Sequence, residues 1–417
     1  MKNFDVLLIA TVSFLATQSR AGNLTVNGDL TISNNLTAQS ITLGGETQTN
    51  WNSLPLQGSK YVIVPQGTND AHRGNNLRAA YTRAASLGPS ASNRITVIVP
   101  PGAYNLGSDG LVMDTSYVDI IGLVPCQMTT KQVFTDRAGR QRSKTVSAAE
   151  QHTASINGTI TQTVDNVHIE SVYLQFYWPT VSGTNTVLRH VWMTDMRNIG
   201  GGLEYAGQYI DCVSGSWGFS SHISGTFIDC VAETHSFGNS EVTTSATLID
   251  CTAYEQSFGG RGGGGASGTF TRCVGGDFCF GGWGNASGTF IDCVAGQESF
   301  AGGGWTASGT FIGCVGDEGS FGSSTEGGGT VSGTFIDCVG GQNSFAGNDE
   351  NSYMTPSAKL RHCKASGGFA GFGASDDFNY NFDGTNTFLM LPYLPTSDSG
   401  LPSGSVWSSN GVLRVKQ

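Results

Sequence analysis

Aspartates that precede regularly spaced cysteines are the residues of this chain best suited to chemistry. In successive copies of a repeat, the residue before the cysteine is Asp211, Asp229, Asp250, Arg272, Asp292, Gly313, Asp337 and His362. If these side chains point outward from stacked strands, neighbouring carboxylates stand ~4.8 Å apart and repel unless paired or metal-bound. An oxygen-rich row suits calcium, which makes Asp229, Asp250 and Asp292 candidate metal ligands. The alternative is a solvated acidic face, or aspartates that cap turns.

Tryptophans in glycine-rich loops form a second candidate site. Trp283 and Trp305 lie ten and twelve residues after their cysteines, Arg261 lies in the preceding loop, and Trp217 is nearer the first repeat. An indole ring presents a broad apolar face with a polar N–H, which suits it to stack on the C–H groups of a sugar. We therefore expect these four residues to bind carbohydrate. The alternative is that the rings fold back over glycine-rich backbone.

The cysteines themselves define the repeat. They are Cys212, Cys230, Cys251, Cys273, Cys293, Cys314, Cys338 and Cys363, at spacings of 18 to 25 residues. Phenylalanine or leucine stands three residues before each one from the second onward, and phenylalanine stands seven residues after all but the last. Cysteines stacked in one column have Cβ atoms farther apart than a disulfide prefers. We therefore expect reduced, buried thiols, although disulfides are common in secreted chains.

This repeat predicts the architecture. About 22 residues with three short, glycine-punctuated strands fit one turn of a right-handed parallel β-helix, called a rung below, and no leucine-rich pattern competes with it. The fold class is therefore all-β, with about 20–25 residues in each rung. Side chains alternate across a strand, so the phenylalanine and the cysteine three residues later can both face inward only if the chain bends between them.

Composition narrows the partners and the compartment. The 417 residues include 60 Gly, and the formal net charge of −11 disfavours nucleic acid and anionic membranes as partners. The apolar run from Val6 to Ala16 is too short to span a bilayer. Ser19 and Ala21 follow it at cleavage-site spacing, which predicts a signal peptide and a secreted or cell-surface protein.

The remaining segments are assigned from their patterns. We expect a signal peptide at 1–21, a β stalk at 22–58, a capping helix with the first rungs at 59–125, an exposed basic insertion at 126–155, repeats at 156–375 and a C-terminal cap at 376–417. The helix is predicted over 76–87, capped by Asn75 or Asn76. Strands are predicted at 95–99 and 118–121, and a hairpin on Asn410-Gly411.

The segment that contains Pro100, Pro101, Gly102 and Tyr104 resembles the opening of the pectate-lyase-like β-helix superfamily. The C-terminal segment resembles those of phage tail and other viral surface proteins, so the likeness spans about residues 60–417. This fold hosts lyases, hydrolases, epimerases, tailspikes and adhesins. Similar pectate lyases bind calcium through aspartates and use an arginine as base. The resemblance therefore implies a catalytic set of Asp229, Asp250 and Arg272.

Three functions stay open at this point. The first is a non-catalytic surface or fibre protein, compatible with a homotrimer, that binds polysaccharide or mediates adhesion. The second is a calcium-dependent polysaccharide lyase or a related glycan-cleaving enzyme. The third is a purely structural surface protein. The motifs of polygalacturonases are missing from the sequence, and this absence favours the first function over the second.

Overall fold

The computed structural model divides the chain into two units, residues 1–50 and 51–417. It describes residues 41–43, 46–48, 60–124, 132–135, 141–143, 154–179, 185–193, 204–220, 222–238, 243–259, 263–322, 328–345, 353–355, 357–365, 380–382, 387–389, 406–409 and 412–415. Of these, residues 41–43, 46–48, 132–135, 141–143, 177–179, 204, 353 and those from 380 onward are described by their backbone alone. The predicted signal peptide and Arg261 lie outside the described residues.

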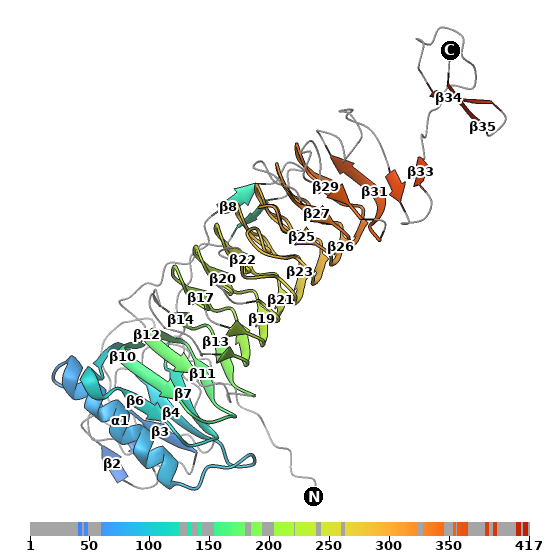
Figure 1. Cartoon of the computed structure of the whole chain (residues 1–417). Coiled ribbons are helices and arrows are strands. Elements are labelled where there is room, and N and C mark those ends of the chain that lie inside the picture. The colour runs from blue at the N-terminus through green and yellow to red at the C-terminus, as the bar shows by residue number, and fades with distance from the viewer. Residues whose placement is uncertain are drawn as a thin grey trace, which may run out of the picture. The chain divides into compact units, whose positions relative to one another are not determined.

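The first unit contains one antiparallel pair, β1 (Ile41–Leu43) with β2 (Glu46–Gln48). The second unit is built on a long sheet, called sheet 1, whose strands pair in parallel up to β31 (Figure 1). Its strands in order are β3 (Tyr61–Ile63), β4 (Ile95–Val99), β7 (Val118–Gly122), β11 (His168–Glu170), β13 (Val187–Arg189), β16 (Gln208–Ile210), β19 (Thr226–Ile228), β21 (Thr247–Ile249), β23 (Thr269–Thr271), β24 (Thr289–Ile291), β26 (Thr310–Ile312), β28 (Thr334–Ile336), β31 (Lys359–Ala365), β32 (Tyr380–Phe382) and β33 (Thr387–Leu389). The last two run antiparallel.

Two further rows of strands complete each turn. Sheet 2 contains β5 (Gly102–Asn105), β6 (Leu111–Met113), β10 (Ala154–Gln162), β12 (Val172–Pro179), β14 (Trp192–Met193), β17 (Val213–Ser214), β20 (Val231–Ala232) and β22 (Thr252–Ala253), and single bridges extend it to β29 (Val339–Gly340). The third row contains β15 (Glu204–Tyr205), β18 (His222–Ile223), β25 (Thr306–Ala307), β27 (Thr330–Val331) and β30 (Tyr353–Met354). The predicted all-β parallel solenoid is therefore confirmed.

Two other antiparallel pairs are present, and one helix. The pairs are β8 (Gln132–Thr135) with β9 (Gln141–Ser143), and β34 (Val406–Ser409) with β35 (Val412–Val415). The last pair flanks the predicted hairpin residues Asn410-Gly411, which lie outside the described residues. A 3-10 turn covers Gly107–Asp109.

The helix, α1 (Asp70–Ser86), begins earlier than predicted. Its N-cap is Asn69, whose side chain accepts a hydrogen bond from the His72 amide at 2.8 Å. The prediction of a start at Asn75 or Asn76 was wrong, because the helix continues through Gly74, a residue type that disfavours helix interiors. Gly74 is required by packing instead: a Cβ added there would lie 1.9 Å from the carbonyl oxygen of Asn105 in β5. The helix packs against β3, β4 and β5.

The predicted bend after each strand of sheet 1 is present. The residue before the inward cysteine, or before a buried valine in the first two rungs, has a left-handed backbone with φ between 50° and 62°. In ten consecutive rungs these residues are Ser171, His190, Asp211, Asp229, Asp250, Arg272, Asp292, Gly313, Asp337 and His362. Glycine adopts this region freely, and aspartate visits it more readily than most other residues. The geometry thus accounts for the predominance of aspartate in this column without any ligand.

Two ladders of stacked aromatic rings fill the interior. Phe270, Phe290, Phe311 and Phe335 stack at 4.6 to 4.9 Å between ring centroids. The second ladder, Phe219, Phe237, Phe258, Phe280, Phe300, Phe321 and Phe345, stacks at 4.6 to 5.3 Å. The two ladders meet edge to face, as Phe290 and Phe300 do at 5.6 Å and 88°. Rings in this arrangement contribute beyond the area they bury.

Small polar groups share this interior and are satisfied there. Nine cysteines of the described residues are buried free thiols, and Cys293 donates to the carbonyl of Phe270 one rung away, at 3.4 Å. Burial raises the pKa of Cys279 to about 12. A column of buried serines lies one residue before the second phenylalanine ladder, and Ser257 donates to the carbonyl of Glu233 at 3.3 Å. These bonds tie each rung to the one before it.

We expect Phe290→Ala to lower the free energy of unfolding by about 3–5 kcal/mol, because it removes a ring stacked on both sides and leaves a cavity. The midpoint and slope of urea denaturation would measure the change. Phe176→Ala is the matched control, since Phe176 is 39% exposed. Equal losses in the two variants would contradict a stabilising role for the ladder.

Candidate functional site

The column of left-handed residues brings together two members of the expected catalytic set, Arg272 and Asp250. Arg272 holds Asp250 with two bonds, Nε to Oδ1 at 2.8 Å and Nη2 to Oδ2 at 2.5 Å. The hydrogen bonds to Asp250 raise the pKa of Arg272. This is the opposite of the direction that a catalytic base requires. The pair therefore compensates charge along the column. Farther along the column, His362 Nδ1 lies 3.2 Å from Asp337 Oδ1.

The three candidate calcium ligands do not form a cluster. Among the residues that the structure describes, no group of three or more His, Cys, Asp or Glu side chains is arranged to hold a metal ion. Asp292 is exposed, and its Oδ1 lies 2.5 Å from where a Cβ on Gly313 would stand. Asp229 occupies the rung before Asp250 in the same left-handed position. Calcium binding by Asp229, Asp250 and Asp292 stays a prediction.

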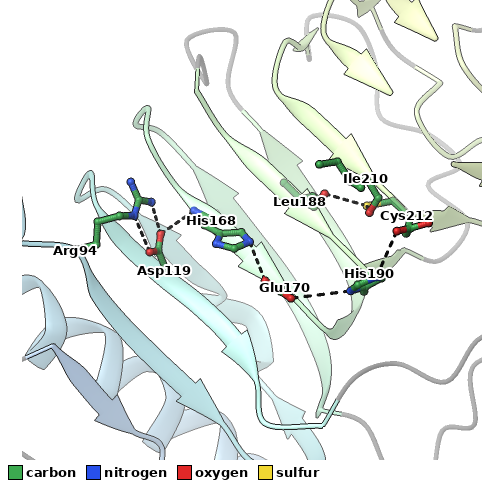
Figure 2. Close-up of polar contacts among 9 residues, drawn as sticks. Arg94, Asp119, His168, Glu170, Leu188, His190, Ile210 and Cys212 are labelled. Atoms are coloured by element: carbon green, nitrogen blue, oxygen red, sulfur yellow. Dashed lines mark hydrogen bonds and ion pairs between the residues drawn. The ribbon is translucent and has the colours of Figure 1, made fainter. Parts of the chain in front are cut away.

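A polar row on the first rungs of sheet 1 is a candidate that the sequence did not reveal (Figure 2). It begins at Asp119 on β7, which is 4% exposed and is held by both ends of the Arg94 guanidinium. Asp119 also accepts the backbone amide of His168 at 2.8 Å. Because a buried charge is costly unless it is paired, this arrangement fixes the position of β11 relative to β7.

The row continues through alternating imidazoles and carboxylates. His168 Nε2 lies 3.1 Å from Glu170 Oε2, and the other oxygen of Glu170 lies 4.0 Å from His190 Nδ1. His190 Nε2 in turn lies 3.4 Å from Asp211 Oδ2 (Figure 2). Burial lowers the pKa of His168, which keeps its ring neutral at neutral pH. A neutral imidazole beside a carboxylate is typical of a general base, although the buried Nε2 of His168 makes no hydrogen bond here.

A sequence signal for this row existed but was weak. His168 and Glu170 are two residues apart on one strand, so their side chains share a face. His190 and Asp211 each stand at the left-handed position that follows a strand of sheet 1. The rungs of His168 and His190 lack the phenylalanine and cysteine columns of the later repeats, so the register that aligns β11 and β13 with β16 could not be inferred from spacing.

The tryptophans form a second candidate, the indole platform, which we define as Trp283 and Trp305. Their exposures are 49% and 41%. The bridges Ala266–Ala286–Ala307 set the register of their loops. In that register Trp283 lies between Gly263 and Gly304 of the adjacent rungs. Trp305 likewise lies beside Gly284, and beside Gly329 through the pairing of Thr306 with Thr330. Among the described residues, the glycines at these register positions supply no side chain that could cover either indole.

The surroundings of the described tryptophans differ. Trp283 also packs on its surroundings: a Cβ added to Gly303 would lie 3.1 Å from its Cδ1, and Phe278 meets its ring edge at 5.9 Å. One side of the indole is thus supported and the remainder is open. Trp217 is different, because it occupies a left-handed turn and stacks on His235 at 4.4 Å and 2°. Arg261 lies outside the described residues.

No protein-family model and no curated protein sequence matches the chain. Among solved structures, the A-module of the mannuronan C-5 epimerase AlgE6 from Azotobacter vinelandii aligns with a TM-score of 0.30 and 12% sequence identity, over 70% of this chain and 89% of that one. No helix among the described residues is long and apolar enough to cross a membrane.

A pair of substitutions distinguishes a backbone role of the aspartate column from a ligand role. We expect Asp292→Gly to leave stability nearly unchanged, because glycine adopts the left-handed backbone freely. Asp292→Val should lower the free energy of unfolding by about 1–2 kcal/mol, because a side chain branched at Cβ clashes there. Thermal melting with and without calcium would measure both variants.

Asp317→Val is the control for this comparison, because Asp317 is not among the residues with positive φ. If calcium stabilised the wild type and both Asp292 variants lost that stabilisation equally, the ligand role would be supported instead.

Proposed function

We propose that this protein is a secreted, non-catalytic β-helical surface protein that binds polysaccharide through the indole platform. The observation that carries the proposal is the pair of half-exposed indoles on adjacent rungs, each flanked by glycine. Neighbouring rungs stand ~4.8 Å apart, so the platform offers two sugar-stacking faces within reach of one glycan chain.

The charge around the platform favours an uncharged polymer. In the sequence from 204 to 345, Arg261 and Arg272 are the only lysines or arginines, and Arg272 is already paired with Asp250. Acidic side chains lie in the same rungs, such as the exposed Asp292. A polyanionic glycan would meet repulsion here with few cations to offset it. A neutral polysaccharide is therefore the expected ligand, while secretion, adhesion and homotrimer formation remain parts of the proposal.

We expect the purified protein to be retained on at least one neutral polysaccharide matrix in a panel of neutral and acidic polymers. Trp283→Ala and Trp305→Ala should each weaken retention by about tenfold, equivalent to about 1.4 kcal/mol, since each removes one stacking face. Affinity electrophoresis or column retardation would measure the change, with thermal melting to verify the fold.

Trp217→Ala is the matched control, because Trp217 is covered by His235. Retention that survives in the double variant of Trp283 and Trp305 would reject the platform as the binding site.

The polar row favours a second candidate function, a glycan-cleaving enzyme. His168 beside Glu170 supplies a neutral imidazole that could accept a proton from a sugar, and His190 lies within the same chain of contacts. This candidate is distinct from the calcium-dependent lyase implied by Asp229, Asp250 and Arg272. The two candidates differ in the strands of sheet 1 that would carry the catalytic residues: β11 and its neighbours in the first, β19 to β23 in the second.

If the second candidate is correct, acidic polysaccharides incubated with the protein and calcium will become shorter or gain the absorbance of unsaturated uronates. His168→Gln should abolish the product, and His362→Gln, far along the column, should not. Because burial lowers the pKa of His168, the rate should persist as pH falls through about 6.5, its ordinary pKa. Loss of product in Arg272→Ala but not in His168→Gln would favour the calcium-dependent version, and no product in the wild type would reject both.

A further inference from the structure

Six consecutive strands of sheet 1, from β19 to β28, present two uniform rows of side chains on their outer face. Each strand buries its middle residue and turns the first and third outward. We call these rows the Thr/Ile face; they are Thr226, Thr247, Thr269, Thr289, Thr310 and Thr334, and beside them Ile228, Ile249, Thr271, Ile291, Ile312 and Ile336. Threonine therefore pairs with threonine in every one of these rungs.

The face is regular in both directions. Rungs repeat at ~4.8 Å, and the two outward residues of a strand are about 6.6 Å apart. The phenylalanines directly beneath report the geometry of the same rungs, since Phe270, Phe290, Phe311 and Phe335 stack at 4.9, 4.8 and 4.6 Å with interplanar angles of 3°, 4° and 1°. Rings this parallel leave little twist between rungs, whereas ordinary sheets rotate by roughly 20–25° per strand. The face is thus close to flat.

Its chemistry is as uniform as its geometry. The two rows contain hydroxyl and methyl groups and no charge. In the same columns, the nearest charged residues are Lys359 and Arg361, one rung beyond β28, and Arg189, two rungs before β19. The aspartates of the next column lie past the left-handed bend, at the rim. Threonine and isoleucine branch at Cβ, so few rotamers are open to them, and their methyl and hydroxyl groups hold one orientation.

Two common occupants fit this face poorly. The face extends over five rung intervals of ~4.8 Å in one direction and about 6.6 Å in the other, so its area is a few hundred Å² at most. Each partner in a standard protein interface buries roughly 800 Å². A second copy of the chain therefore gains too little area here. A glycan chain also lacks what it needs, because the face carries no aromatic ring for stacking and no charged group to orient hydroxyls.

We propose that the Thr/Ile face binds the surface of ice. A crystal of water is flat and periodic, its oxygen rows repeat at a distance close to the spacing of these rungs, and it carries no net charge. Threonine hydroxyls in one row supply hydrogen-bonding groups at the lattice period. The methyl groups of both rows order the water between them. Each contact is weak, so binding depends on many of them matching the lattice at once, which a rigid, untwisted array permits.

This proposal is independent of carbohydrate binding, since the indole platform lies in the loops before the third row of strands. The test measures thermal hysteresis and ice-crystal shape with the full protein. We expect a gap between melting and freezing points that grows with protein concentration, and faceted crystals. Thr289→Tyr with Thr310→Tyr should reduce the gap to that of buffer, because the bulky rings lift the face off the lattice.

Thr306→Tyr with Thr330→Tyr is the matched control, because it places the same side chains on the third row of strands; the gap should remain. Ile291→Lys is a second disruption of the face if the tyrosine pair fails to fold, as judged by thermal melting. Absence of hysteresis and faceting in the wild type would overturn the proposal. An undiminished gap in folded face variants would also overturn it.

Discussion

Stacking of identical side chains at a fixed spacing is the interaction on which the rest of this structure depends. Each phenylalanine of the two ladders can lie parallel to its neighbours only if consecutive rungs stay in register and hardly rotate. The ladders meet edge to face, so a shift of one would disturb the other. Rung length can still vary between 18 and 25 residues, because the loops between strands absorb the difference.

The left-handed bends follow from the same requirement. To place Phe290 and Cys293 both inside, the chain must turn at Asp292, and it does so at a positive φ. A second pair of left-handed residues, such as Glu298 and Phe300, encloses the buried Ser299. A bulky residue in this conformation is strained, and the stacking of Phe300 on two neighbours offsets the strain. The predominance of aspartate in this column therefore follows from backbone geometry and needs no explanation from a surface function.

How far the sequence could predict the molecule depends on the repeat. Where phenylalanine and cysteine recur, the register of strands, the need for a bend and the buried thiols could all be inferred from spacing. Where they do not recur, the register of neighbouring strands could not be inferred from spacing. His168, Glu170 and His190 come together because β11 and β13 pair in a particular register, and no spacing in those rungs revealed it.

The helix start failed for a related reason. Gly74 normally counts against a helix interior, but here a tertiary contact with Asn105 requires it. The indole platform was half predictable: both tryptophans were evident as residues of comparable loops. Their isolation between glycines depended on the one-residue offset between Trp283 and Trp305, which only the bridge register shows. Local sequence patterns thus predicted the contacts between repeats that share the phenylalanine and cysteine columns. They missed contacts that involve residues outside those columns.

Because the strands stack in register, each outward column of residues forms a separate surface. Separate surfaces on one scaffold can serve different functions. The left-handed column must accept residues tolerant of positive φ, so it alternates aspartate with arginine, glycine and histidine. The threonine column has no such constraint and is uniform through six rungs. Backbone strain cannot explain that uniformity, because many residues suit an outward strand position. The contrast between the uniform Thr/Ile face and the varied left-handed column beside it is what the ice-binding proposal for the first surface requires.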